Sequence, residues 1–488
     1  MPTNKPRVMV VSDHSSLHTG FANVSRHILN HLYDTGKYEM AEFGWFAPRK
    51  SDVPKDMLPR WEVYVTNQTN ADIALKDQYG VISLEGALVA FKPDVVISIG
   101  DEWMVNHIGP LRDKHDFVWI GYTPIDGMPH PPEWVKTFAS MNLCVAYGRW
   151  GVNVMRQRNP QIQPAWIFHG VEADIYKPDP AGRKFAREAM NVKDDEWLIG
   201  YVGRNQPRKM IPVVFKAFAM WTKPHVWCPD TGKPWIVTRS EWYINELFHV
   251  VNDMPYAKLS RDTATKLISP FTGKMLVDMT KDEDEVARQL DNIICENPQA
   301  KLYLHCAIND VGWNINEQIA RYKLNGRVIL KDDLRVGRGV SDADLAKIYN
   351  AFDVFTLPTV GEGFGLPILE AMSCGIPIAV TDYSGHTEWC REAGVMLKPA
   401  VYFTETFSNI ERAIVDNTEY VKALDHLYTD RQAYKRYAHN GRFVAERMDW
   451  KRNILPQWEI LVDRAIAEKP ARKPQVDTGA AKANVEIC

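Results

Sequence analysis

The chain has 488 residues, of which 45% are hydrophobic and 24% are charged, and its formal net charge is −3 at pH 7. This composition is ordinary for a globular protein and excludes a largely disordered chain. The net charge gives no sign of a nucleic-acid-binding protein as a whole, although a local basic groove stays open. The length predicts two or three domains.

Seven cysteines are scattered along the chain without a C-x-x-C pair: Cys144, Cys228, Cys295, Cys306, Cys374, Cys390 and Cys488. Several lie in apolar segments, so we interpret them as reduced thiols of a cytoplasmic protein. The apolar run after residue 6 is too short for a signal peptide, and no stretch approaches a membrane span in length. We expect a soluble protein, with peripheral membrane association left open.

Short apolar runs rich in β-branched residues alternate with segments of helical period in the first part of the chain. Strands are predicted at 7–13, 38–45, 94–100, 116–125, 143–148 and 165–170. A helix that stops near Gly36 is predicted from four apolar residues on one face, Val24, Ile28, Leu29 and Leu32. This alternation is typical of βα units and a parallel sheet.

A second series of the same kind begins near residue 196. Its predicted strands are 196–204, 300–306, 327–332, 353–359, 377–382 and 394–399. A helix after the first of them carries Ile211, Val214, Phe215 and Phe218 at helical spacing. The polar join 170–184, with its two prolines, is the predicted hinge between two α/β sheets.

Domain boundaries follow from this pattern. We predict Rossmann-like α/β domains at 1–175 and 176–445, a helix at 446–466 that packs back on the first domain, and a disordered tail at 467–488. Residues 221–285 interrupt the second series and are interpreted as an insertion. It contains two hairpin-like segments, but only Cys228 could supply a thiolate there, so no zinc site is predicted.

The stretch "GEGFGLPILEAMSCG", residues 361–375, joins a strand to a helix through a glycine-rich loop. Pro367 is expected at the first helical position and Gly375 at the stop. The free N–H groups near Gly365 and Leu366 then lie at a helix N-terminus, which favours an anion such as phosphate.

Two glutamates bracket this loop, Glu362 before the helix and Glu370 one turn inside it, so they cannot share a helix face. A surface acid and an acid that stabilises the helix dipole would explain either residue alone. Together with their neighbours, the two glutamates favour a ligand that contains a diphosphate. One carboxylate would bind the group on one side of the diphosphate, and the other would bind the group on the opposite side, such as a ribose.

The segments "SDADLAKIYNAFDVFTLPTVGEGFGLPILEAMSCGIPIAVTDYSGHTEW", "YVGRNQPRKMIPVVFKAFA" and "HGVEADIYKP" together resemble the retaining GT-B glycosyltransferases of family 4, the group 1 family. The mark of that family is E-x7-E, matched by Glu362 and Glu370. Glu172 stands where the family commonly has Asp. The resemblance is strong from about 196 to 460 outside the insertion and weaker from 7 to 195.

This resemblance implies two Rossmann-like domains facing a cleft, with the acceptor on the first and a nucleotide-diphosphate sugar on the second. It implies a hexosyl- or pentosyltransferase in which Arg204 and Lys209 neutralise the diphosphate, Glu370 binds ribose and Glu362 holds the donor sugar. Gly365 and Leu366 would bind the donor, and Gly20 would let the backbone approach its phosphates, although a simple loop glycine explains Gly20 equally well. No metal and no cofactor besides the donor substrate is implied.

A histidine usual in the first domain of the family has no clear counterpart here. Tyr122, Asp126 and His130 are the local candidates, and we select Asp126 as a catalytic residue because it lies on a turn at the carboxyl end of a predicted parallel strand. A turn-stabilising Asp is the plainer alternative. Asp101 has a similar position.

Other activities stay open at this point. Phosphorylases and epimerases share the implied fold but lack support in the residues, and a non-catalytic sugar-nucleotide-binding protein is disfavoured by the intact Glu362 and Lys209. The acceptor would be a glycan or a lipid-linked saccharide by default. A modified base in viral DNA is an alternative that the balanced charge of the insertion does not support.

Overall fold

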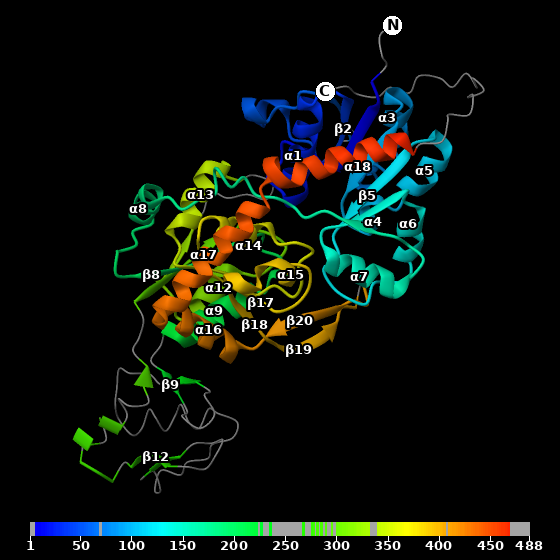
Figure 1. The fold of residues 1–488 in the computed structure, drawn as a ribbon. Coiled ribbons are helices and arrows are strands. Elements are labelled where there is room, and N and C mark those ends of the chain that lie inside the picture. Colours follow the sequence, from blue (N-terminus) through cyan, green and yellow to red (C-terminus); the bar gives the residue numbers. More distant parts are fainter. Residues whose placement is uncertain are drawn as a thin grey trace.

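Two parallel α/β sheets organise the molecule in the computed structural model (Figure 1). The structure describes residues 5–67, 71–222, 299–331, 339–406 and 408–468, with short pieces at 225–227, 234–236, 266–268, 275–278, 280–282, 284–285, 288–289 and 294–295. The predicted insertion at 221–285 therefore lies mostly outside the described residues, as do Cys228 and the predicted tail beyond 468.

The first sheet has the order β3-β2-β1-β4-β5-β6-β7 with all neighbours parallel. Its strands are β1 (Arg7–Asp13), β2 (Glu39–Trp45), β3 (Glu62–Val65), β4 (Val95–Ile99), β5 (Val118–Thr123), β6 (Leu143–Ala146) and β7 (Ala165–Trp166). The helices are α1 (Gly20–Asp34), α2 (Ala71–Lys76), α3 (Leu84–Phe91), α4 (Glu102–Val105), α5 (Ile108–His115), α6 (Trp134–Ser140) and α7 (Arg149–Arg158).

The second sheet has the order β15-β14-β8-β16-β17-β18, again parallel throughout. Its strands are β8 (Trp197–Val202), β14 (Ala300–His305), β15 (Val328–Leu330), β16 (Val354–Leu357), β17 (Ile378–Thr381) and β18 (Gly394–Leu397). The helices are α8 (Pro180–Ala189), α9 (Ile211–Thr222), α12 (Ile315–Arg321), α13 (Asp342–Ala351), α14 (Leu366–Ser373), α15 (Thr387–Cys390), α16 (Asn417–Thr429) and α17 (Arg431–Arg447).

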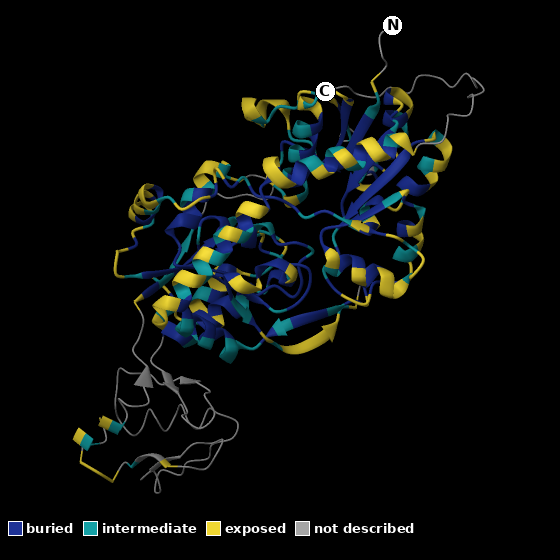
Figure 2. Ribbon diagram, viewed as in Figure 1, coloured by how far each residue is buried: buried dark blue, intermediate teal, exposed yellow. Residues whose placement is uncertain are grey.

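Both sheets reverse their strand order beside the first strand of the sheet, between β1 and β4 and between β8 and β16. In open α/β sheets ligands bind outside the carboxyl ends of the strands at this point of reversal. The central strands of each sheet, among them β1, β4, β5, β8, β16 and β17, are deeply buried (Figure 2). Val24, Ile28, Leu29 and Leu32 of α1 are buried as predicted, and so are Ile211, Val214, Phe215 and Phe218 of α9.

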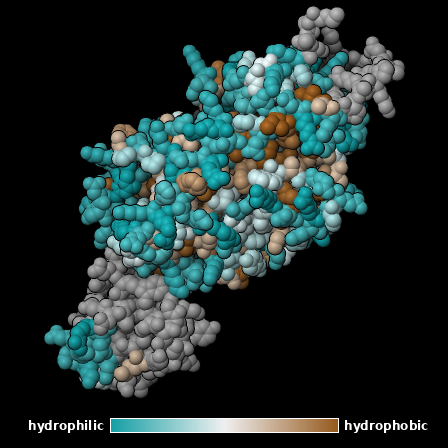
Figure 3. Space-filling view, viewed as in Figure 1, coloured by the Kyte–Doolittle hydropathy of each residue, from teal (hydrophilic) through white to brown (hydrophobic). Residues whose placement is uncertain are grey.

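The end of the chain returns to the N-terminal domain. A π-helical turn (Trp450–Ile454) leads into α18 (Leu455–Ala467), which packs on α1, β4 and β5 (Figure 1). The Tyr38 hydroxyl donates to the Asp463 carboxylate, and the backbones of Val171 and Trp450 are hydrogen-bonded. A hydrophobic area lies over this helix in Figure 3, and Ile460 of α18 is exposed.

Several sequence expectations need correction. The strand predicted at 165–170 is only two residues long, and Pro180 of the predicted hinge already begins α8, because Asp179 caps that helix. Strand β3 and the antiparallel hairpin of β19 (Pro399–Thr404) and β20 (Glu411–Val415) were not predicted. Within 221–285 the structure describes four short strands, β9 (His225–Trp227), β10 (Pro234–Ile236), β11 (Lys266–Ile268) and β12 (Met275–Asp278), and β13 (Ile294–Cys295) lies beyond the predicted end of the insertion.

Candidate active site

The glycine-rich loop 361–365 connects β16 to α14 and is shaped by close backbone contacts. A Cβ on Gly361 would lie 2.2 Å from the carbonyl oxygen of Asp126, so only glycine allows this approach of the two domains. Gly365 caps α14 with a φ of 92°, which a residue with a side chain adopts only under strain. Leu366 is the first helical residue, so Pro367 stands at the second position rather than the first.

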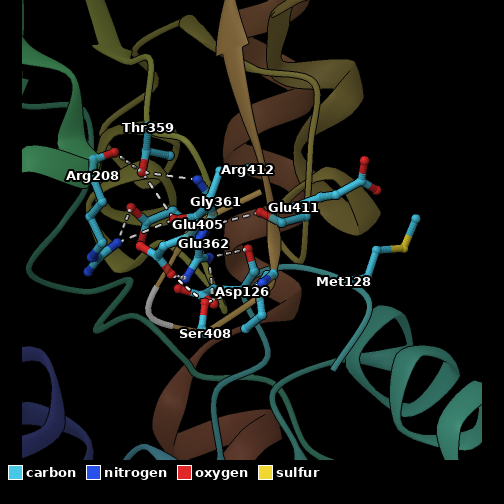
Figure 4. A network of polar contacts seen from close by, with 12 residues as sticks. Asp126, Met128, Arg208, Thr359, Gly361, Glu362, Glu405, Ser408, Glu411 and Arg412 are labelled. Atoms are coloured by element: carbon cyan, nitrogen blue, oxygen red, sulfur yellow. Dashed lines mark hydrogen bonds and ion pairs between the residues drawn. The ribbon is translucent and has the colours of Figure 1, made fainter. Parts of the chain in front are cut away.

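Glu362 is buried at the centre of a cationic cluster. Its carboxylate accepts a hydrogen bond from the Arg208 guanidinium at 3.1 Å (Figure 4). It also accepts one from the Lys209 ammonium, and the Glu362 N–H donates to Ser384 Oγ at 2.8 Å. Burial opposes ionisation of Glu362, but the charges of Lys209 and Arg208 outweigh it and lower the pKa to about 2. The carboxylate is therefore ionised at neutral pH.

Lys209 ends the 3-10 turn Pro207–Lys209, directly after β8. Burial lowers its pKa to about 8 in spite of the attraction of Glu362, so the ammonium is still largely protonated at pH 7. His386 adjoins the same cluster: its Nε2 donates to the Thr381 carbonyl at 2.7 Å, and its buried Nδ1 has no partner among the described residues. This leaves Nδ1 free to accept a hydrogen bond from a ligand.

Glu370 lies on α14, one turn beyond the loop, and accepts a hydrogen bond from the Tyr349 hydroxyl at 2.7 Å. Burial raises the pKa of Glu370 to about 7, and the nearby Asp342 adds to the effect. Glu362 and Glu370 therefore have different electrostatic surroundings: Glu362 lies among cations, whereas no cation among the described residues lowers the pKa of Glu370. The sequence placed both residues correctly relative to the helix but gave no information on these partners.

Arg204 does not join the cluster around Glu362. Its guanidinium forms a two-point ion pair with Asp310, at 3.0 and 2.8 Å, and it remains half exposed. It lies close enough to Asp13 of the N-terminal domain for its charge to counteract the rise in the pKa of Asp13 that burial causes. Arg208, four residues on in the same "RNQPRK" segment, is the arginine that contacts Glu362, and the sequence analysis missed it.

Asp126 reaches from the loop after β5 to the C-terminal domain. Its carboxylate pairs with Arg412 of β20 at 2.7 Å, and the Arg412 guanidinium also contacts Glu405 at 3.2 Å (Figure 4). Of the other two local candidates, Tyr122 donates its hydroxyl to the Ile167 carbonyl, and His130 is buried against Trp134 and Phe138.

Gly20 is the first residue of α1, with Thr19 as the N-cap. A Cβ at Gly20 would meet nothing within 4 Å, so packing within the protein does not require glycine there.

Among the residues that the structure describes, no group of three or more potential metal ligands is found, and no helix is long and apolar enough to cross a bilayer.

Comparison with known proteins was made on sequence and on structure. Residues 270–417 match the family model described as Glycosyl transferases group 1. Over 60 residues the chain is 45% identical to O-antigen chain mannosyltransferase B of Escherichia coli, which covers 12% of this chain and 16% of that protein. Over 157 residues it is 27% identical to a D-inositol 3-phosphate glycosyltransferase of Stackebrandtia nassauensis, covering 29% and 32%. The matches thus span about a sixth and about a third of these relatives.

Solved structures resemble the whole chain. Sucrose-phosphate synthase of Thermosynechococcus elongatus has a TM-score of 0.64 at 16% identity, covering 95% of this chain and 100% of that one. Anabaena Alr3699/HepE, solved with UDP and glucose, has a TM-score of 0.62 at 13% identity, covering 94% and 100%. These likenesses and the two parallel sheets identify the GT-B fold. The family match and the relatives named as glycosyltransferases support a transferase enzyme.

Proposed function

We propose that this protein is a retaining glycosyltransferase of family 4 that moves a sugar from a nucleotide-diphosphate sugar to a hydroxyl acceptor. The observation that carries the proposal is the pairing of the buried Glu362 with the buried Lys209 and with the partly exposed Arg208 in front of the N-terminus of α14, with Glu370 one turn beyond it. Cations, free helix N–H groups and two carboxylates at this spacing suit a diphosphate with a sugar on one side and a ribose on the other.

The chemistry that follows is electrostatic. Lys209 and the start of α14 would hold the diphosphate and stabilise the charge that grows on it as the bond to the donor sugar breaks. Glu362 would bind hydroxyls of the donor sugar, and His386 Nδ1 supplies a further acceptor beside it. The acceptor oxygen bonds to the anomeric carbon on the face that the diphosphate leaves, and the hydroxyl proton passes to the departing diphosphate.

Arg204 would bind a phosphate of the donor in this proposal. Its guanidinium is half exposed and near Asp13 of the N-terminal domain, and it would exchange its ion pair with Asp310 for the phosphate. Asp126 supports Arg412 and lies beside the Glu362 loop, so it would shape the donor-sugar site from the N-terminal domain. Gly20 and Leu366 offer backbone N–H groups to the donor. UDP is a first choice of nucleotide to test, because Alr3699/HepE was solved with it.

Thermal unfolding with UDP, GDP, ADP, CDP and dTDP in turn tests this function, because a ligand that binds only the folded state raises the melting temperature. We expect one nucleotide to raise it and Lys209→Ala to abolish the rise. Lys216→Ala on the exposed side of α9 is the matched control and should keep it. The absence of a shift with any nucleotide would contradict the proposal and favour a scaffolding protein.

The stereochemistry is tested separately on the product. Once a donor is identified, proton NMR of the transferred sugar reports its anomeric configuration, which should equal that of the donor. An inverted product would refute the retaining mechanism while leaving sugar transfer itself in place.

A further inference from the structure

An exposed aromatic cluster lies at the carboxyl edge of the N-terminal sheet. Tyr79 stands at its centre, with ring centroids 5.6 Å from Phe46 and 5.0 Å from Trp103, each at nearly perpendicular angles. Phe46 is 45% exposed and Trp103 44% exposed, which is a large apolar surface to leave in water. Buried Trp45 supports the cluster from beneath, 5.3 Å from Tyr79.

The backbone conformation of Phe46 is strained. Phe46 follows β2 with a φ of 55°, a left-handed conformation that bulky residues rarely adopt. Trp103 stands in the short helix α4, directly after β4. Strained positions of this kind persist where the surrounding structure enforces them and gather at functional sites. The exposed rings therefore call for a functional explanation.

Carboxylates line the same edge of the sheet. Asp13 ends β1, Asp101 follows β4 and Asp126 follows β5, and the sheet order places β1, β4 and β5 side by side. Neighbouring strands lie about 4.8 Å apart, so the three acids form a row across the point where the strand order reverses. Asp101 lies in the middle of this row.

Asp101 has the properties of a ligand-binding group. It stands at the N-cap of α4, yet its side chain accepts no hydrogen bond from that helix. Burial raises its pKa to about 7, and Asp126 adds to the rise while Arg208 and Arg412 counteract it. Gly100, directly before Asp101, lies against Trp45 beneath the aromatic cluster, since a Cβ there would be 3.0 Å from the Trp45 ring. The charge of Asp101 also acts on the phenol group of Tyr79 and helps to raise its pKa.

Tyr147, after β6, is a buried residue whose hydroxyl is unpaired among the described residues. The residue is 4% exposed. Its ring packs on Tyr122 and His169 and faces Gly363 of the glycine-rich loop, so a molecule bound beside that loop would complete the bonding of this hydroxyl.

We propose that Phe46, Tyr79, Trp103 and Asp101 form the acceptor subsite, and that this subsite takes a neutral sugar ring. The aromatic faces would pack against the C–H face of the ring, and Asp101 would accept a hydrogen bond from one of its hydroxyls. Asp126 is already paired with Arg412, so the carboxylates of Asp13 and Asp101 are the ones that disfavour an acceptor that carries phosphate, which includes DNA. This inference rests on the proposed function, since it supplies the acceptor for the same reaction.

Saturation-transfer NMR with the full chain tests the subsite directly. The probes are the methyl glycosides of glucose, mannose, galactose and N-acetylglucosamine, with glucose 6-phosphate and a short single-stranded DNA as the phosphate-bearing alternatives. We expect at least one neutral glycoside to bind. Phe46→Ala and Trp103→Ala should each weaken that binding at least fivefold, and Asp101→Asn should weaken it as well.

The matched control is Phe443→Ala, which removes a similarly exposed ring from α17 of the C-terminal domain and should leave glycoside binding unchanged. The inference is overturned if no glycoside binds, if glucose 6-phosphate or DNA binds better, or if the Phe46 and Trp103 variants bind as the wild type does. The nucleotide-induced rise in melting temperature separates the two proposals, because it depends on Lys209 and not on these aromatic residues.

Discussion

At the scale of single residues, the two glutamates of the E-x7-E spacing differ more in their surroundings than in their sequence context. Glu362 is held ionised by two cations, whereas Glu370 is buried beside a tyrosine and has its pKa raised to about 7. The first is suited to stay charged beside a sugar. The second is suited to exchange hydrogen bonds with neutral hydroxyls.

Replacing Glu362 should separate catalysis from binding. We expect Glu362→Gln to lower the rate of transfer at least 100-fold, a loss typical of removing one group that acts on the transition state. Nucleotide affinity, measured by calorimetry, should change less than threefold because Lys209 remains. Equal losses of rate and affinity would overturn the role assigned to Glu362.

Glu370 should leave a signature in the pH dependence of stability. Its carboxyl keeps its proton in the folded state up to about pH 7 but loses it near 4.5 when the chain unfolds, so the folded state loses stability as the pH rises from 4.5 to 7. Glu370→Gln removes this loss. Melting temperatures should therefore favour the variant increasingly toward pH 7, and a difference independent of pH would contradict the shift.

The same variant should weaken nucleotide binding. A lost hydrogen bond between neutral groups costs about 0.5–1.5 kcal/mol, or roughly twofold to tenfold in affinity. Titration calorimetry with the nucleotide found by thermal unfolding measures this change. Unchanged affinity would remove the ribose-binding role of Glu370.

At the scale of elements, the loop between β16 and α14 places Glu362 by backbone geometry. Gly361 lets the loop touch the Asp126 carbonyl, and Gly365 turns the chain into the helix with a left-handed φ. The order strand, glycine loop and helix is visible in the sequence. The contact with the other domain is not.

Gly365→Ala tests the elbow. The strained φ should cost about 1–2 kcal/mol of stability, and the shifted helix start should weaken nucleotide binding. Gly326→Ala is the matched control, because Gly326 also has a positive φ, of 77°, but nothing lies within 4 Å of its Cβ position. Both variants should melt at lower temperature and only Gly365→Ala should lose affinity. Equal nucleotide affinity in the two would show that the helix start does not bind the donor.

At the scale of the whole molecule, the relative position of the domains depends on a few polar contacts and on α18. Arg412 is buried between Asp126 and Glu405, and the Glu411 N–H donates to the Met128 carbonyl at 3.0 Å (Figure 4). At a separate place, where the chain passes between the domains, the Trp450 N–H donates a hydrogen bond to the Val171 carbonyl at 3.1 Å. Further contacts between the domains include the Trp150 N–H, which donates to the Glu388 carboxylate at 3.0 Å, and the candidate site lies beside the Arg412 contact.

Arg412→Gln should open the molecule. The variant leaves the partly exposed carboxylates of Asp126 and Glu405 without their cation, and water screens part of the resulting cost, which should stay below the roughly 3–5 kcal/mol of a fully buried pair. We expect a melting temperature lower by several degrees and a larger radius of gyration in X-ray scattering. Arg464→Gln breaks an exposed pair with Glu468 on α18 and should change neither quantity. An unchanged radius in Arg412→Gln would show that this pair does not hold the domains.

The sequence by itself determined the two parallel sheets, the helix faces of α1 and α9, and the loop and helix around Glu362 and Glu370. These depend on local periodicity and on glycine and proline signals, which act over a few residues. Tertiary structure alone decided that Arg208 rather than Arg204 contacts Glu362, that Asp126 pairs with Arg412, and that His386 adjoins the cluster. It also decided that Phe46, Tyr79 and Trp103 meet beside Asp101. Such contacts join residues far apart in the chain, and their geometry follows from packing and charge pairing in three dimensions, which no local pattern records.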